Sequence, residues 1–248
     1  MANVSGDSVK KNYDTLVSKL KQEMSTEDAA LRFAVGAEFI SVGKIERDLL
    51  ISLGLRPDQT VVDVGCGSGR LAYPLTRFLE SGRFIGFDVV TDLVEYARKI
   101  TNRPDWLFET TSGTTIPLPD ETADFISFFS VLTHLRHEES FFYLKEAKRV
   151  LRPEGRIVFS FIEFQIPCHW DIFQYMLSDL RPERVHNQFI SRDAIAAWAG
   201  HLGLEVVGIH DGDKPHIPLS ETVQWDNGNV MVGMGNLGQS VAVLRKQR

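Results

Sequence analysis

The stretch Val61-Val62-Asp63-Val64-Gly65-Cys66-Gly67-Ser68-Gly69-Arg70 decides the fold of this chain. It opens with β-branched residues, which is the composition of a buried strand, and a helix-like segment over residues 71–79 follows it. Its glycines stand at alternate positions, where a side chain would hold the backbone away from a ligand. A strand, a glycine turn and a helix in this order offer backbone N–H groups and a positive helix end. We therefore expect a ligand-binding turn here.

The spacing of these glycines separates two kinds of nucleotide-binding turn. A dinucleotide fingerprint reads G-x-G-x-x-G, whereas here the glycines read G-x-G-x-G and Arg70 stands in the slot of the last one. The Lys-Ser or Lys-Thr pair of a phosphate loop does not follow the turn. Asp63 lies inside the strand, and a buried carboxylate is costly unless it is bonded, so we expect it to brace the turn or to meet a cationic ligand.

Length and composition set the class of protein. The chain has 248 residues and a formal charge of -6, which favours one α/β domain with a small appendage and disfavours a broad nucleic-acid surface. Two cysteines make neither a disulfide framework nor a zinc site, so we expect a cytoplasmic protein. The first residues lack a signal-peptide pattern, and no apolar run approaches the roughly 18 residues of a membrane span. We expect no membrane association.

Asp88 is the second candidate ligand residue. It ends a predicted strand over residues 83–87 and follows Gly69 by 19 residues. An acidic residue about 20 residues beyond the glycines binds ribose hydroxyls in this kind of βαβ unit. The alternative is a cap on the helix predicted from Thr91, and we favour the ribose role.

Four segments resemble one family. Asp-x-Gly-x-Gly-x-Gly at 63–69 is similar to the first motif of class I S-adenosylmethionine (SAM) dependent methyltransferases. Asp88, the strand 123–129 running into Thr133-His134-Leu135, and the turn at 149–155 follow in the family's order, so the resemblance covers residues 57–163. It implies a Rossmann-like, doubly wound α/β fold with helices on both faces. It also implies a mostly parallel sheet, whose antiparallel last strand is inserted between strands five and six.

The resemblance also implies SAM as the cofactor. Ser112 stands where family members often carry an acidic residue facing adenine, so contact there is left to the backbone of Ser112 and Gly113. The expected cofactor-binding residues are Asp63, Gly65, Cys66, Gly67, Gly69, Asp88, Val89, Ser112, Gly113 and Ser130.

Methyl transfer to a hydroxyl needs a base that removes the proton. The candidate catalytic residues are His134, Glu163 and His169, with His137 as a further histidine. His134 directly follows strand four, at the carboxyl edge where open α/β sheets bind ligands, although each histidine could equally be structural. Ser130 stands where a metal site would want a carboxylate, so we expect no metal.

These features favour a SAM-dependent methyltransferase acting on a small molecule, most simply a hydroxyl of a sugar or secondary metabolite. The alternatives are an N- or C-methyltransferase and a non-catalytic SAM-binding scaffold subunit. The end of strand four lacks the Asn- or Asp-Pro-Pro-Tyr sequence of many methyltransferases that act on DNA bases, which with the acidic charge argues against a nucleic-acid partner. A homodimer is left open.

We expect one methyltransferase domain over residues 1–248, with an N-terminal helical cap at 1–45 and a substrate-cap insertion at 164–190. Both segments are aromatic enough to enclose the acceptor. Further helices are predicted from Met24 or Ser25 and over 44–53, further strands over 105–109, 156–162 and 204–210, a long loop over 211–239, and an edge strand over 240–244.

Overall fold

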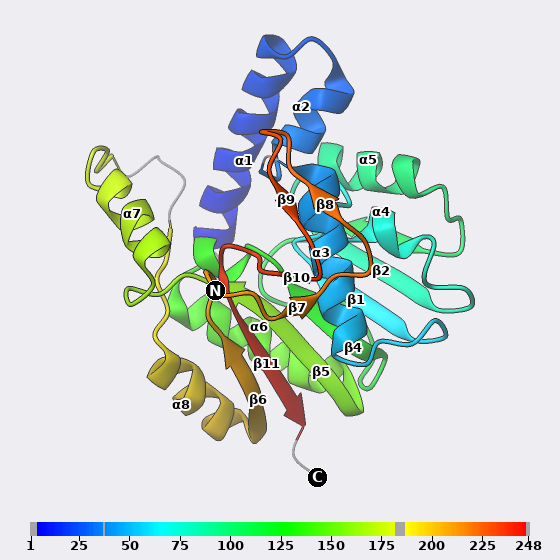
Figure 1. The fold of residues 1–248 in the computed structure, drawn as a ribbon. Helices are drawn as coiled ribbons and strands as arrows, with labels where there is room; N and C mark the ends of the chain where they lie inside the picture. The colour runs from blue at the N-terminus through cyan, green and yellow to red at the C-terminus, as the bar shows by residue number, and fades with distance from the viewer. Residues whose placement is uncertain (1–3, 37, 182–186, 247–248) are drawn as a thin grey trace. The chain divides into compact units, whose positions relative to one another are not determined.

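The computed structural model describes residues 4–36, 38–181 and 187–246 (Figure 1). The chain divides into two compact units. The glycine-turn unit comprises residues 13–111 and 215–237, and the β5 unit comprises residues 1–12, 112–214 and 238–248. Whether they act as the single domain expected from the sequence stays a prediction.

The glycine-turn unit is built on three parallel strands in the order β3-β2-β1. They are β1 (Thr60–Val64), β2 (Arg83–Asp88) and β3 (Leu107–Thr110). Helix α4 (Ala72–Leu75) connects β1 to β2, and helix α5 (Thr91–Thr101) connects β2 to β3. The predicted strand ending at Asp88 is confirmed. The helix expected over 71–79 is shorter, since the Thr76 hydroxyl bonds the Tyr73 carbonyl and competes with the helical ladder.

The N-terminal segment supplies three helices, α1 (Val4–Glu23), α2 (Glu27–Phe33) and α3 (Phe39–Ser52). Thr26, rather than Ser25, caps α2, because its hydroxyl accepts from the Ala29 N–H at 3.1 Å. In the glycine-turn unit, Val17 and Leu20 of α1 and Leu31 of α2 share one buried cluster with α5. Helix α3 starts five residues before the predicted Lys44, so the apolar stretch before it is helical.

Residues 215–237 form two small hairpins, not the predicted loop. Strand β7 (Ile217–Pro218) pairs with β10 (Met234–Gly235), and β8 (Val223–Gln224) pairs with β9 (Val230–Met231). The prediction was wrong because strands this short show no alternating pattern. The hairpins are bound to α3, where buried Asp48 accepts from the Ser220 N–H at 2.8 Å.

The β5 unit contains β4 (Ala123–Phe128), β5 (Leu151–Phe161), β11 (Ser240–Lys246) and β6 (Leu204–His210), in that order. Strands β4 and β5 are parallel, whereas β11 is antiparallel to both β5 and β6. The inserted antiparallel strand implied by the family is confirmed. The edge position predicted for 240–244 is wrong, since a strand with neighbours on both sides has fully buried side chains at Val241 and Leu244.

Besides the start of α1, the described part of the β5 unit contains the helices η1 (Leu132–His134, a 3₁₀ turn), α6 (His137–Val150), α7 (Pro167–Met176) and α8 (Arg192–Leu202). With seven main strands, all but one running parallel, and helices around them, the fold is Rossmann-like α/β. Within the described ranges, no helix is long and apolar enough to cross a membrane.

Candidate cofactor and acceptor sites

The glycine turn has the backbone that its sequence predicts. Gly65, Gly67 and Gly69 have φ values of 77°, 52° and 86°, a region that favours glycine. The N–H groups of Gly65 and Cys66 both donate to the Phe87 carbonyl, at 2.7 and 2.9 Å, which joins the turn to the end of β2. Gly67 also has no space for a side chain, because a Cβ there would lie 2.4 Å from Val35 Cγ1.

Asp88 connects the glycine turn to the start of α5. Its Oδ2 accepts from the Gly67 N–H at 2.8 Å and its Oδ1 accepts from the Val90 N–H at 2.9 Å. Burial raises the pKa of this carboxyl above its ordinary value, and these backbone bonds oppose the shift. Asp88 does stabilise the helix start, yet each carboxylate oxygen has a second lone pair, so both can still accept ribose hydroxyl protons.

The remaining residues of this turn fit a small ligand. Asp63 and Cys66 are buried, and the Cys66 thiol, whose pKa burial raises, packs over Gly86, where a Cβ would lie 2.9 Å from its sulfur. Within the described residues, the buried Ser68 hydroxyl has no hydrogen-bond partner. This unpartnered hydroxyl, the close approach at Gly67 and the carboxylate of Asp88 fit the polar groups of SAM.

A roof from the N-terminal segment lies over the turn. The Arg70 guanidinium donates to the Val35 carbonyl at 2.8 Å and to Glu46 Oε1 at 2.7 Å. Burial raises the pKa of Glu46, and Arg70 opposes that shift. Burial first and the Asp88 charge second raise the pKa of Tyr13 to about 12, while Arg70 lowers it. The Tyr13 phenol therefore lies within electrostatic range of both groups.

Three cofactor candidates belong to the β5 unit. Ser112 is exposed, and the Gly113 carbonyl accepts from the Tyr143 hydroxyl at 2.7 Å. Ser130 ends the segment after β4 with φ 58°, an uncommon value for a serine. Its N–H donates to Ser160 Oγ at 2.7 Å. Strain of this kind persists where surrounding bonds fix the backbone, and it often marks a functional position.

His134 stands on η1, six residues past the end of β4, and is half-buried. The neighbouring Thr133 carbonyl accepts from the Gln188 N–H at 2.6 Å, which ties this turn to the segment before α8. His137 is occupied differently, since its Nε2 lies 3.1 Å from the Phe189 carbonyl and its ring packs edge-on against Trp198.

Glu163 and His169 lie together in a buried network. The Glu163 N–H donates to His169 Nδ1 at 3.1 Å, so the neutral ring carries its proton on Nε2, which donates to the Gly238 carbonyl at 3.0 Å. Arg192 binds both Glu163 oxygens at 2.8 Å, and the Ser240 hydroxyl donates to Oε1 at 2.5 Å. Both Glu163 and His169 are therefore held by neighbouring groups of the β5 unit, and the role of His134 stays a prediction.

Arg192 also binds Asp211, and both interactions hold the pKa of its guanidinium above the ordinary value. Lys214 first, then Arg192, lower the pKa of Asp211 to about 2. Sequence reasoning missed this network and the roof residues Val35 and Glu46. No local pattern marks them, because each partner comes from a distant part of the chain.

Comparison with known proteins agrees with this geometry. The family model described as a methyltransferase domain matches residues 62–159. An uncharacterised 37.1 kDa protein in transposon Tn4556 of Streptomyces fradiae is 31% identical over 193 residues, which cover 77% of this chain and 50% of that protein. The ubiquinone/menaquinone biosynthesis C-methyltransferase UbiE of Ruegeria sp. (strain TM1040) is 29% identical over 222 residues, covering 75% of this chain and 87% of the relative.

Among solved structures, the magnesium protoporphyrin IX methyltransferase ChlM of Synechocystis PCC 6803, with bound S-adenosylhomocysteine (SAH), has the same fold. Its TM-score is 0.61 at 14% identity, over 94% of each chain. The chain carries a domain of the class I SAM-dependent methyltransferase family, for which SAM is the methyl donor. It spans half or less of the length of the first four curated relatives that it matches.

Proposed function

We propose that this protein transfers the methyl group of SAM to a hydroxyl of a small-molecule acceptor such as a sugar or secondary metabolite. The observation that carries the proposal is the pairing of the left-handed glycine turn with Asp88 through the Gly67 N–H. This pairing fixes a carboxylate beside a glycine turn at the end of a parallel strand, the arrangement that recognises a ribose in this kind of βαβ unit.

The residues have separate roles in this proposal. Gly65, Gly67 and Gly69 let the backbone approach the amino-acid end of SAM, with Ser68 and Asp63 beneath, while Asp88 accepts the ribose hydroxyls. Val89, Ser112 and Gly113 contact adenine, and Ser130 contacts the donor near its methyl group. SAM, when bound, supplies a methyl group already activated by its sulfonium, so the protein contributes alignment and exclusion of water.

His134 has the remaining role of removing the hydroxyl proton. Histidine is the side chain best suited to accept a proton at neutral pH, and here it would take the hydroxyl proton while the acceptor oxygen attacks the methyl carbon. The roof built by α1, α2 and Val35 keeps water from the donor. We further propose that the protein works in the cytoplasm, on neither nucleic acid nor membranes and without a metal ion, as a monomer or homodimer.

The test is transfer of a labelled methyl group from SAM to a panel of hydroxylated, amine and activated-carbon metabolites, with EDTA in one arm. Label in an O-methyl product that persists with EDTA supports the proposal. Label found only in N-methyl or C-methyl products would show that the acceptor atom is nitrogen or carbon and not the proposed hydroxyl oxygen. SAH binding without transfer to any member of the panel would favour the non-catalytic scaffold. Loss of transfer on chelation, restored by magnesium, would contradict metal independence.

A further inference from the structure

Four aromatic side chains of the β5 unit form one ring cluster. Phe164 stacks on Phe189 with centroids 4.4 Å apart and planes 12° apart, and Phe173 meets both rings edge-on at 5.4 and 5.7 Å. Trp170 lies 5.0 Å from Phe173 and 6.3 Å from Phe164. We call Phe164, Trp170, Phe173 and Phe189 the ring platform.

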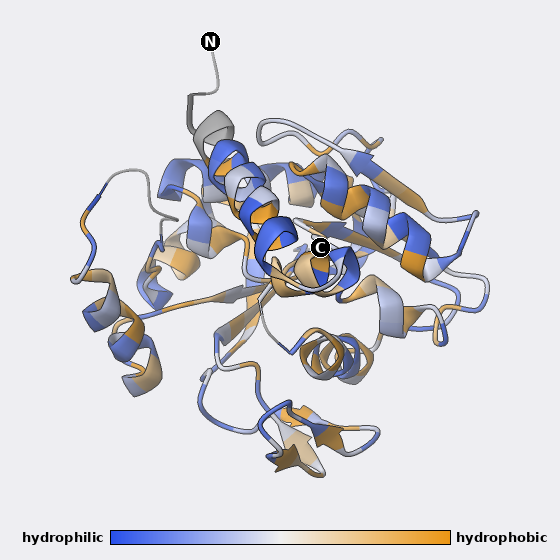
Figure 2. Ribbon diagram, turned by 90° about the horizontal axis from the view of Figure 1, so that it is seen from above, coloured by the Kyte–Doolittle hydropathy of each residue, from blue (hydrophilic) through white to orange (hydrophobic). Residues whose placement is uncertain are grey.

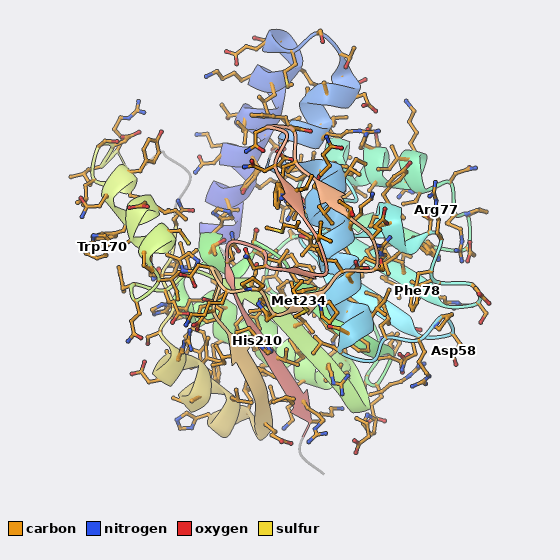
Figure 3. The ribbon with its side chains drawn as sticks, in the orientation of Figure 1. Asp58, Arg77, Phe78, Trp170, His210 and Met234 are labelled. Atoms are coloured by element: carbon orange, nitrogen blue, oxygen red, sulfur yellow. The ribbon has the colours of Figure 1, made fainter. Side chains whose placement is uncertain are left out.

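The platform has a buried side and an open side. Phe189 is only 7% exposed and packs in a small core with Ile162 and Met176. Phe164 and Trp170 are 52% and 43% exposed, and the Trp170 side chain projects outward from α7 (Figure 3). In the hydropathy view, hydrophobic and hydrophilic residues alternate along α7 (Figure 2). Exposed aromatic rings of this size are costly to leave in water, which marks the open side as a binding surface.

The platform is joined to the element that carries the candidate base. Phe189 and its neighbours lie between β5 and η1, because the Ile190 N–H donates to the Ile162 carbonyl at 2.9 Å and the Gln188 N–H donates to the Thr133 carbonyl at 2.6 Å. Thr133 immediately precedes His134. The rings and the base are therefore held by one hydrogen-bonded frame at the end of β4 and β5.

Among the residues that the structure describes around the platform, the basic side chains nearest in sequence are already paired with acidic groups. Helix α7 has no lysine or arginine, and its single acidic residue is Asp171. The nearest described arginines in sequence are occupied, since Arg181 pairs with Asp179 at 2.7 Å and Arg192 pairs with Glu163 at 2.8 Å. Within this described part of the chain, a carboxylate or phosphate group on a ligand would have to compete for an arginine that is already paired, whereas a neutral ring would stack on Phe164 and Trp170.

From these observations we infer that the ring platform binds the methyl acceptor, and that this acceptor is a neutral molecule containing a hydroxylated aromatic ring. The inference rests on the proposed methyltransferase function and narrows its acceptor class. The acceptor's ring stacks on the exposed faces of Phe164 and Trp170, which leaves its hydroxyl toward η1 and His134.

The experiment uses 2-naphthol as the aromatic probe, its saturated analogue decahydro-2-naphthol, and methyl glucopyranoside as a sugar probe. Calorimetry measures the affinity of each for the full chain with SAH present. We expect 2-naphthol to bind better than both other probes. Phe164→Ala and the bulkier Phe164→Leu should each lower the affinity for 2-naphthol by about three- to tenfold, which is the contribution of one aromatic contact.

Tyr175→Ala is the matched control, because Tyr175 lies on the same helix at 79% exposure and makes no ring contact with the platform among the described aromatic pairs. It should leave 2-naphthol affinity unchanged, and all variants should keep the SAH affinity and melting temperature of the wild type. The inference would be overturned if 2-naphthol bound wild type and Phe164→Leu with equal affinity. It would also be overturned if the saturated analogue bound as tightly as 2-naphthol, or if the glucoside bound more tightly.

Two further outcomes are distinguishable. Sedimentation that shows a wild-type dimer and a Phe164→Ala monomer, without naphthol binding, would make the platform a subunit interface and contradict the inference. Failure of the wild type to bind SAH would remove the proposed function itself. Ring-dependent naphthol binding would then mark an aromatic-ligand site, and the inference of a methyl acceptor would be overturned with that function.

Discussion

At the scale of single residues, Asp88 is the residue that we propose to bind the ribose of SAM. It accepts N–H bonds from Gly67 and Val90, so it both shapes the glycine turn and holds α5. Replacing it separates these two effects. Asp88→Ala should weaken SAH binding by about 1–3 kcal/mol, the cost of leaving ribose hydroxyls without a charged acceptor. Calorimetry measures this, and an unchanged affinity with a lowered melting temperature would make Asp88 a helix cap alone.

The pH dependence of SAH affinity gives an independent reading of the same residue. Burial raises the pKa of Asp88 above 3.8, and ribose hydroxyls favour the ionised carboxylate, so binding lowers that pKa again. Affinity should therefore be constant near neutral pH and fall as the pH is lowered through the raised pKa. Asp88→Asn, which cannot ionise, should bind more weakly but without this fall; the same acid-side fall in both proteins would assign it to another group.

His134 is the residue on which turnover should depend. His134→Ala should lower the rate by about 100-fold or more if it takes the hydroxyl proton, with SAH affinity nearly intact. His137→Ala is the matched control, because the His137 ring packs on Trp198 and bonds the Phe189 carbonyl. This substitution should lower the melting temperature and have less effect on the turnover rate. Comparable loss of SAH binding and stability in His134→Ala would instead make His134 a packing residue.

At the scale of elements, the N-terminal helices lie on the cofactor side of the glycine-turn unit. Helices α1 and α2 share a core with Val90 and Leu93, and Val35 covers Gly67. The sequence suggested a cap on the acceptor. The structure places Val35 over the glycine turn, where we propose that the donor binds, and no local pattern reveals this position.

Removal of this roof is therefore expected to affect the donor. A chain lacking residues 1–32 loses Tyr13 and the packing of α1 and α2 on α5, so SAH affinity should fall together with turnover. Arg70→Met tests the roof within the full chain, because it removes the bonds to Val35 and Glu46. If SAH affinity were retained in both proteins while turnover fell, the helices would serve the acceptor alone.

The elements that could be predicted are those whose pattern is local. Strand β1, the glycine turn and β2 were readable from β-branched residues and glycine spacing, since buried parallel strands have continuous apolar runs. The hairpins at 215–237 were not, because their pairing depends on α3 residues such as Asp48, about 170 positions away. The network around Glu163 and His169 could not be predicted for the same reason, because their partners Arg192 and Gly238 are distant in sequence.

At the scale of the whole molecule, the Glu163 network joins the ends of several elements of the β5 unit. Glu163 is 3% exposed, and Arg192 is its cationic partner. Arg192→Met would leave a buried carboxylate without that partner and should lower the free energy of unfolding by about 3 kcal/mol. Urea unfolding measures this change, with Arg181→Met as the control. Loss of the exposed pair between Arg181 and Asp179 should lower the free energy of unfolding by less than about 1 kcal/mol. Equal effects of the two changes would show that the network is not a structural centre.

The central claim is that the glycine turn and Asp88 bind SAM. Calorimetry of the full chain with SAH, SAM and NAD tests it most directly. The account predicts binding of SAH and SAM, loss of that binding in Gly67→Val because even a Cβ there would meet Val35 at 2.4 Å, and no binding of NAD. Binding of NAD with none of SAH or SAM would contradict it.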